Sequence, residues 1–395
     1  MALPDTLTPL VLAFMIAALV CAVVFVYPYV VYPALLRFLS EKPIALGAPR
    51  STDGGEFTLI FSAYNEAESL PSTLEHLGRL RARYPRLEIL AYDDCSQDET
   101  AAMLETSVAG ISVVRAPQRT GKAHGMKVLA RRAHGELLVC IDANVLIDVD
   151  ALDRLLPYYD DPSVGGVAGH LVYVNAGDSA TSATGGSYWR LEERIKRLEA
   201  RARSTMGADG SVFSVRASLY PTFPDTVQDD FAVSMSVIYA GYRLVWAPDV
   251  VAREEHTTNH GVEFARKVRI GTRAFHTHLW MAERRRATFG PTEWFMYLSH
   301  KWVRWHGLFA LALAAAFALT ALSLHASILG VVAGLLCAVG VVAASRTRRG
   351  PLASLTSLVA AVTATGLGVV RARRGVVQPT WATPRQRDAS DEESR

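Results

Sequence analysis

Residues 136–150, ELLVCIDANVLIDVD, contain the stretch that decides the fold of this chain. Residues 137–141 form an apolar, partly β-branched run, which is typical of a strand covered on both faces. Asp142 and Asn144 follow at once, where open α/β sheets bind ligands beyond the carboxyl ends of their strands. Two oxygen donors one residue apart can face a divalent cation that carries substrate phosphates. A capping Asp followed by an ordinary turn Asn is the structural alternative.

The composition predicts a membrane component. The chain has 395 residues, of which 50% are hydrophobic, and its mean hydropathy is +0.17. Residues 7–36 contain no charged side chain, are long enough for a span of ~20 residues, and lack the charged start of a secretory signal, so we expect a retained anchor. Residues 307–345 could supply two more spans, and residues 351–370 another.

The charges around the first apolar stretch predict its orientation. Arg37, Lys42 and Arg50 follow this stretch, whereas only Asp5 precedes it. The positive-inside rule therefore places the following domain in the cytoplasm, in a multi-pass protein of the cell (inner) membrane. The basic run at 371–374 also favours the cytoplasm, so three, four or five spans remain open.

The net charge and the cysteine spacing bear on nucleic-acid binding, disulfide bonds and zinc sites. A formal net charge of +3 gives no support for nucleic-acid binding. The cysteines have neither disulfide nor zinc spacing, which fits a reducing cytosol; they are Cys21, Cys95, Cys140 and Cys337.

Strand-like and helix-like stretches alternate after residue 56. The expected strands are 57–62, 87–93, 111–116 and 137–143. The expected helices between them are 67–83, 98–105 and 122–133. This alternation predicts a parallel sheet with right-handed crossovers and helices on both faces.

Polar residues follow each expected strand. The strand ends are SAYNEAES (62–69), YDDCSQDET (92–100), QRTGKAHG (118–125) and the acid-amide pair after residue 141. Each has a structural explanation as a turn, a cap or a surface lysine. Four polar ends on one sheet edge together indicate a ligand site.

The motif series SAYNE, YDDCSQDET, RTGKAHG, CIDAN, MGADGSVFSVR, VQDDF and FARKVRI resembles a membrane-embedded family-2 glycosyltransferase, over residues 57–305. Its relatives include hyaluronan, chitin, cellulose and poly-N-acetylglucosamine synthases. The resemblance implies an α/β GT-A (Rossmann-like) cytoplasmic domain with transmembrane and interfacial helices. The implied segments are an anchor and linker (1–50), the GT-A domain (51–282), an amphipathic interfacial helix (283–306), C-terminal transmembrane helices (307–375) and a polar tail (376–395).

The resemblance also assigns donor and metal residues. The nucleotide-sugar site would comprise Tyr64, Glu66, Asp93, Asp94, Lys122, Asp142, Arg266 and Arg269. The expected cofactor is Mg²⁺ or Mn²⁺, held by Asp142, Asn144 and His256. Asn144 stands where the family's D-x-D motif has its second Asp, and an amide oxygen ligates without a full charge. His256 as an ordinary loop histidine is the alternative.

The acidic motif at 228–230 would supply the catalytic base. Asp230 matches the family's base, with Asp229 as a neighbouring partner or the alternative base. An inverting transfer needs a carboxylate to take the proton of the acceptor hydroxyl. The structural alternative is that both acids cap the helix expected at 231–240.

In the family, a turn of small residues that leads into a strand and an arginine lies at the acceptor site. This pattern corresponds here to Gly207, Gly210 and Arg216. Trp189, near the start of an expected charged helix, could stack on an acceptor sugar. A hairpin with a surface arginine and a core tryptophan explains the same pattern.

The basic stretch 264–270 departs from the family's Q-x-x-R-W motif. Arg269 matches its arginine, whereas Arg266 and Ile270 replace Gln and Trp. Arg266 and Arg269 would share a helix face, since they are three residues apart. A basic helix on anionic lipid is the alternative.

The membrane edge is expected at residues 293–309, where aromatic residues recur at helical spacing beside basic ones. This pattern predicts an amphipathic helix at the interface. Residues 383–395 are polar, lack apolar periodicity and are expected to be disordered.

The function implied is an integral-membrane inverting glycosyltransferase that uses a UDP-sugar and a divalent metal to form a β-linked glycan. Two alternatives stay open: transfer of one sugar to a lipid-linked acceptor, and a non-catalytic subunit of a polysaccharide export assembly. The expected partners are a UDP-sugar, a glycan or lipid-linked acceptor, the bilayer and, as further partners, a second copy or export subunits. No nucleic-acid partner is expected.

Overall fold

The computed structural model describes residues 8–174, 180–254, 260–325 and 351–380, with the backbone alone at 180–188, 260 and 351–357. The strands are β1 (Phe57–Ala63), β2 (Glu88–Asp93), β3 (Ser112–Arg115), β4 (Leu137–Ile141), β5 (Leu146–Ile147), β6 (Val164–Tyr173), β7 (Val212–Arg216) and β8 (Arg243–Glu254). The helices of the α/β domain are α3 (Leu70–Arg83), α4 (Thr100–Glu105), α5 (Lys122–Arg132), α6 (Ala151–Leu155), α7 (Ala180–Ala202), α8 (Asp229–Tyr239) and α9 (His260–Trp280). The α/β alternation predicted from the sequence is confirmed.

The described residues form one eight-stranded sheet in the order β3-β2-β1-β4-β7-β6-β8-β5. The first four strands are parallel, as predicted. The prediction of a parallel sheet does not extend further, because β7 runs antiparallel to both β4 and β6. The residues that precede β7 are thereby brought to the edge where β4 ends.

Strand β4 is buried on both faces, as its apolar run predicts. Val139 and Ile141 pack with Leu77 in the core on the α3 side of the sheet. Cys140 packs with Met126 of α5 in the core on the other side. The strand is therefore fixed from both sides, and its polar carboxyl end projects at the sheet edge.

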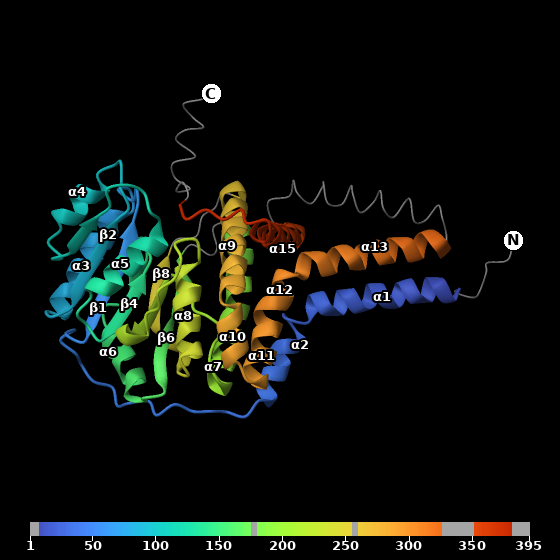
Figure 1. Ribbon diagram of the computed structural model, residues 1–395, viewed down its shortest axis with the longest axis horizontal. Coiled ribbons are helices and arrows are strands. Elements are labelled where there is room, and N and C mark those ends of the chain that lie inside the picture. The colour runs from blue at the N-terminus through green and yellow to red at the C-terminus, as the bar shows by residue number, and fades with distance from the viewer. Residues whose placement is uncertain (1–7, 175–179, 255–259, 326–350, 381–395) are drawn as a thin grey trace, which may run out of the picture.

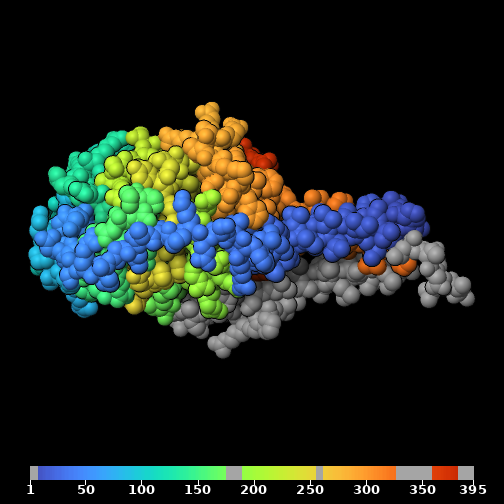
Figure 2. Space-filling view, turned by 90° about the horizontal axis from the view of Figure 1, so that it is seen from below, coloured from blue at the N-terminus to red at the C-terminus, as the bar shows by residue number. Residues whose placement is uncertain are grey.

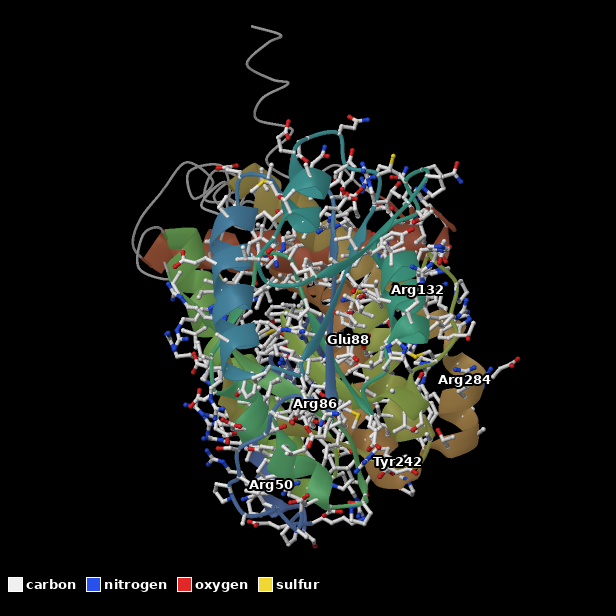
Figure 3. All side chains as sticks on the ribbon, turned by 90° about the vertical axis from the view of Figure 1, so that its left-hand side faces the viewer. Arg50, Arg86, Glu88, Arg132, Tyr242 and Arg284 are labelled. Carbon is white, nitrogen blue, oxygen red and sulfur yellow. The ribbon has the colours of Figure 1, made fainter. Side chains whose placement is uncertain are left out.

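The segment between the N-terminal anchor and β1 runs along the surface of the domain (Figures 1 and 2). Arg243, which is buried, donates to the carbonyl oxygens of Lys42 at 2.6 Å and Ala200 at 2.7 Å. Further along, Arg50 forms an ion pair with Asp160, and Figure 3 shows Arg50 at the bottom of the domain. These contacts tie the linker to the α/β domain.

The helices beyond the α/β domain are α1 (Pro9–Val26), α2 (Val31–Leu35), α10 (Ala282–Thr288), α11 (Pro291–Tyr297), the π-helix η4 (Leu298–Trp302), α12 (Val303–Trp305), α13 (Gly307–His325) and α15 (Pro351–Arg373). A third hydrophobic core joins the α/β domain to α2, α11, α12 and α15. In this core Tyr32, Phe231 and Trp305 are buried together with side chains of α7 and α9. The helix that carries the acidic motif is thus packed on the segments that lead to the apolar helices.

Two described helices, α1 and α13, are long and apolar enough to cross a bilayer by length and composition. They lie side by side and extend away from the domain, whereas α15 is seen end-on beside α9 and the start of α13 (Figure 1). Helix α15 packs mainly against α9. A membrane span at residues 351–370 stays a prediction. Residues 326–350 lie outside the described residues.

The expected interfacial helix at 293–309 is broken rather than continuous. A π-helical turn occupies residues 298–302, and His306 separates α12 from α13. Tyr297 and Trp305 are buried in the third core, whereas Trp302 is 41% exposed. The aromatic stripe is therefore divided between the protein core and the outer surface.

Small residues allow α15 to approach α9 closely. A Cβ at Gly368 would lie 2.6 Å from the backbone nitrogen of Thr272 and 2.9 Å from the carbonyl oxygen of Val268. A Cβ at Gly271 would lie 3.3 Å from the Cα of Thr365. Because these neighbours are backbone atoms, a larger residue could be accommodated only if the helices moved apart.

We therefore expect Gly368→Ala to destabilise the protein by about 1–3 kcal/mol through overpacking. Gly78 on α3 is the matched control, because a Cβ there would meet nothing within 4 Å. Gly78→Ala should raise stability by roughly 0.5–1 kcal/mol, since it removes a helical glycine. Thermal unfolding of the detergent-solubilised protein measures both changes. Equal midpoints for the two variants would contradict the close crossing.

Candidate active site

The carboxyl ends of β1, β2 and β4 meet at one edge of the sheet. Asp93 ends β2 and pairs in register with Ala63 at the end of β1. Asp142 follows β4, and the antiparallel pairing of Ile141 with Val212 places the loop before β7 beside it. The polar motifs that are far apart in the sequence are therefore brought to one edge.

Lys122 lies at the centre of this edge. Its Nζ contacts an Oδ of Asp142 and lies 3.6 Å from Oδ2 of Asp229. A Cβ placed on Gly210 would lie 3.1 Å from Oδ2 of Asp230 and 3.2 Å from Lys122 Nζ. The same Cβ would lie 3.5 Å from Oδ2 of Asp142. One cation and two carboxylates thus meet at Gly210, with Asp229 beside the cation, and a side chain at position 210 would press into the cluster.

Burial and charge perturb the ionisation of this cluster. Burial and the neighbouring Asp229 raise the pKa of Asp230 to about 7, although Lys122 and the N–H of Phe231 oppose the shift. Burial alone would lower the pKa of Lys122, but the carboxylates of Asp142, Asp229 and Asp230 together raise it above its usual range. Asp230 therefore changes its proton occupancy near neutral pH while Lys122 stays charged.

Asp93 and Asp94 are nearly fully buried and shape the neighbouring loops. Asp94 accepts hydrogen bonds from the backbone N–H of Thr120 at 2.7 Å and of Gly121 at 3.0 Å. Asp93 accepts one from the N–H of Ser96 at 3.2 Å. The loop that leads into Lys122 is therefore held by Asp94. Direct contact of either acid with a nucleotide stays a prediction.

Arg119, which the sequence reasoning did not select, covers the ring of Tyr64. Its guanidinium carbon lies 3.4 Å from the ring centroid, and its Nε lies 3.6 Å from Oδ2 of Asp94. Glu66 is close by: its N–H donates to Thr100, and its carboxylate accepts from Ser69. The signal in the sequence was a second cation three residues before Lys122.

Helix α9 brings three arginines toward the same cluster. Arg266 lies 3.6 Å from Glu263 and 4.0 Å from Glu254. Burial lowers the pKa of Arg269 to about 10, with the positive charges of Arg266 and Arg273 adding to the effect and Asp142 opposing it. The electrostatic influence of Asp142 on Arg266 and Arg269 places this helix face toward the end of β4.

Arg273 was also missed by the sequence reasoning. It continues the face of Arg266 two turns later and is 4% exposed. It donates to the carbonyl oxygen of Val227, just before the acidic motif, and to that of Pro379 at 3.1 Å. The carboxylates of Asp229 and Asp230 counteract the fall in its pKa that burial causes. Arg273 thus supports the start of α8.

Residues 58–221 match the family model described as Glycosyl transferase family 2. The chain carries a glycosyltransferase family 2 domain.

Two curated synthases are similar to this chain. The poly-beta-1,6-N-acetyl-D-glucosamine synthase of Staphylococcus aureus (strain COL) is 28% identical over 203 residues, which cover 48% of each chain. The synthase of the same name from Staphylococcus epidermidis is 26% identical over 223 residues, which cover 53% of each chain. The chain thus spans about half the length of the curated relatives it matches.

The mannosyltransferase PcManGT from Pyrobaculum calidifontis, solved in complex with GDP-Man and Mn²⁺, has the same fold. Its TM-score is 0.71 at 23% identity, and the match covers 91% of this chain and 99% of that one. The Rossmann-like GT-A fold predicted from the sequence is therefore confirmed for the glycosyltransferase domain.

The structure places one predicted acceptor residue, Arg216, away from the cluster. Arg216 pairs in register with Leu137, at the opposite end of β4 from Asp142, and donates to the carbonyl oxygens of Val164 and Tyr159. For Arg216 the structure fits the alternative in which it supports the fold.

Trp189 lies beside the loop that contains Gly210. Its ring nitrogen donates to the carbonyl oxygen of Leu171 at 3.0 Å. The Nζ of Lys196 lies 4.8 Å from the centroid of its ring, and the same ammonium forms an ion pair with Asp209. Contact of Trp189 with an acceptor stays a prediction.

Gly207 and Gly210 belong to the loop at 205–211, which a buried polar network holds. Gly207 has a φ of +103°, which favours glycine. At one end of the loop, Glu199 accepts from the N–H of Met206 at 2.9 Å. At the other end, Asp209 forms an ion pair with Lys196.

The same network reaches the helices that lead to the membrane segments. Glu199 also accepts from the hydroxyl of Tyr32 at 2.6 Å and lies 2.8 Å from a ring nitrogen of His300. The other ring nitrogen of His300 lies 2.8 Å from Glu192. Glu192, on α7, also forms an ion pair with Arg304 of α12. The loop beside Asp230 is thus connected to α2 and to the π-helix η4.

The chemistry of the end of β4 fits a divalent cation. Asp142 remains about one-third exposed beside the buried cluster, and Asn144 adds an amide oxygen. One carboxylate and one amide suit a hard cation whose other ligands are phosphates and water. Among the described residues no group of three or more His, Cys, Asp or Glu side chains is arranged around a cation site. His256 lies outside the described residues.

The raised pKa of Asp230 predicts a pH-dependent effect on stability. Its pKa of about 7 exceeds the ordinary value of 3.8, so ionisation at high pH destabilises the folded state. This contribution is fully present below about pH 4 and is lost as the pH rises through about 7. We expect Asp230→Asn to raise the melting temperature by several degrees at pH 8, at about 2–4 °C per kcal/mol, and by clearly less at pH 5.

Glu75→Gln is the control for this measurement, because Glu75 is exposed on α3. Its effect on the melting temperature should be small at both pH values. If the increase in melting temperature caused by Asp230→Asn is the same at pH 5 and pH 8, the raised pKa of Asp230 is contradicted.

Proposed function

We propose that the protein is a membrane-associated, inverting glycosyltransferase that uses a UDP-sugar and a divalent metal to form a β-linked glycan. The observation that carries this proposal is the convergence of Lys122, Asp142 and the acidic motif around Gly210. The family assignment of residues 58–221 and the named synthases among the relatives support it.

The proposed reaction assigns the proton to Asp230. The oxygen of the acceptor hydroxyl attacks the anomeric carbon of the donor while the bond from that carbon to the diphosphate oxygen breaks. The hydroxyl proton passes to the carboxylate of Asp230, and the nucleoside diphosphate leaves with the electron pair. A base whose pKa lies near the working pH suits this step.

Cations of this chain offset the charge of the leaving diphosphate. Lys122 lies at the cluster, and Arg266 and Arg269 approach it from α9. Asp142 and Asn144 would hold the metal, which when bound supplies further positive charge to the diphosphate. Fixed charges of this kind stabilise the transition state more than the ground state.

The membrane location supports a glycan or lipid-linked acceptor. Helices α1 and α13 are the candidate spans among the described residues, and the buried network connects the loop at 205–211 to their base. We propose that the catalytic domain faces the cytoplasm at the cell membrane. A multi-pass topology belongs to this proposal.

Transfer of a single sugar to a lipid-linked acceptor is the second candidate. The observation in its favour is Ile270, which stands where the Q-x-x-R-W motif of polymer-elongating synthases has Trp. The mannosyltransferase from Pyrobaculum calidifontis shares the fold over 91% of this chain. That protein was solved with GDP-Man, so GDP-mannose belongs beside UDP-sugars in any donor test.

The proposal is tested with the full chain in lipid nanodiscs, Mn²⁺, and UDP-N-acetylglucosamine, UDP-glucose or GDP-mannose as donor. Release of UDP with long products would support the synthase, whereas single-sugar products would support the second candidate. Binding of nucleotide without turnover of any donor would favour the non-catalytic export subunit.

In the same assay we expect Asp230→Asn to lower turnover by roughly 10²–10⁴-fold, because it removes the proton acceptor. Binding of UDP should change little, since Asp230 does not hold the nucleotide. Glu75→Gln should leave both quantities unchanged. Full turnover by Asp230→Asn would exclude the proposed base.

The pH dependence separates the two acids of the motif. Turnover should rise with pH through about 7 as Asp230 ionises. Because Asp229 raises the pKa of Asp230, Asp229→Asn should move the midpoint of this rise to lower pH. Loss of turnover in Asp229→Asn alone, with Asp230→Asn active, would reverse the two roles.

A further inference from the structure

Asn144 and Glu254 are brought together by strand pairing. Strand β5 begins two residues after Asn144 and pairs antiparallel with β8, with Leu146 opposite Arg253. Glu254 is the last residue of β8 and follows Arg253 directly. Nδ2 of Asn144 donates to Oε1 of Glu254 at 3.3 Å. The contact is therefore built into the register of the sheet.

This hydrogen bond decides which amide atom of Asn144 is available. The NH₂ group of Asn144 faces the carboxyl group of Glu254, and the carboxyl oxygen accepts this hydrogen bond. The amide oxygen is then the atom that Glu254 does not use. A free asparagine could present either atom to a cation, whereas this one is oriented.

Glu254 also adds negative charge beside Asp142. It is 9% exposed, and Nη2 of Arg266 lies 4.0 Å from its carboxylate. Burial and the nearby charge of Asp142 raise the pKa of Glu254 to about 7, while Arg266 opposes the shift. The site therefore contains a second carboxylate although the motif at 142–144 has only one.

We propose that Glu254 is a positioning residue that orients Asn144 as a neutral oxygen ligand and supplies the charge that the motif lacks. The ligand concerned is a divalent cation bound together with a nucleoside diphosphate. The inference rests on the metal-dependent donor binding proposed above. Groups that orient metal ligands in this way contribute typically 10–100-fold to metal affinity.

The proposal makes an unusual prediction for Asn144→Asp, which restores the common acidic motif. The new carboxylate would face Glu254 at about the distance of the present hydrogen bond, and like charges this close repel. Asn144→Asp should therefore weaken cation binding rather than strengthen it. Adding Glu254→Gln should relieve the repulsion, because the amide can donate to the new carboxylate.

The test measures uptake of Mn²⁺ by the full chain in nanodiscs, in the presence of UDP or GDP, through the electron paramagnetic resonance signal of free Mn²⁺. We expect affinity to fall by about 10–100-fold in Glu254→Gln and to fall in Asn144→Asp. The double variant should return to within several-fold of the wild-type affinity. Thermal unfolding of each variant checks that it is folded.

Glu263→Gln is the matched control. Glu263 is also buried and also lies beside Arg266, at 3.6 Å, and it forms a further ion pair with Lys267. It should affect Mn²⁺ uptake less than Glu254→Gln does. Equal effects of the two variants, or tighter binding by Asn144→Asp alone, would overturn the positioning role.

The outcomes separate this inference from the proposed function. Turnover of a donor by a protein that takes up no Mn²⁺ with either nucleotide would overturn the role of Glu254 and leave glycosyl transfer in place. The wild type, the two single variants and the double variant could take up Mn²⁺ in the expected order of affinity and yet turn over no donor. That result would support the role of Glu254 and contradict the proposed glycosyltransferase activity.

Discussion

Lys122 is a partly buried cation that lies among carboxylates and offsets the repulsion between them. Its Nζ contacts Asp142 and lies near Asp229, and Gly210 leaves the space in which these groups meet. Removing an ion from water is costly, so a buried charge needs partners. Here the acids outnumber the lysine, and the excess negative charge appears in the raised pKa of Asp230. A site with this imbalance attracts further cations, whether arginines or a metal.

The rest of the molecule arranges this cluster. Asp94 holds the loop before Lys122, Arg273 supports the start of α8, and Glu199 and Lys196 hold the loop that contains Gly210. Glu199 also meets Tyr32 and His300, from segments on either side of the α/β domain in the chain. The position of the cluster therefore depends on the docking of the helices that lead to α1 and α13.

Much of the site could be predicted because it lies in local motifs. Asp142, Lys122 and Asp230 follow recognisable strands or begin helices, and the structure brings them together. Arg216 was placed with the acceptor because it follows the small-residue turn, but β7 carries it five residues along an antiparallel strand to the far end of the sheet. Glu254 and Arg273 have no local pattern, since their importance comes from strand pairing and helix packing.

The sequence by itself determined that strands buried on both faces end in polar groups, because apolar runs and turn residues are local properties of the chain. It also determined the presence of long apolar helices at 9–26 and 307–325. Only the tertiary structure decided that α15 packs against α9, because the approach depends on glycines in two distant segments. It alone joined Asn144 to Glu254, since that contact requires the register between β5 and β8.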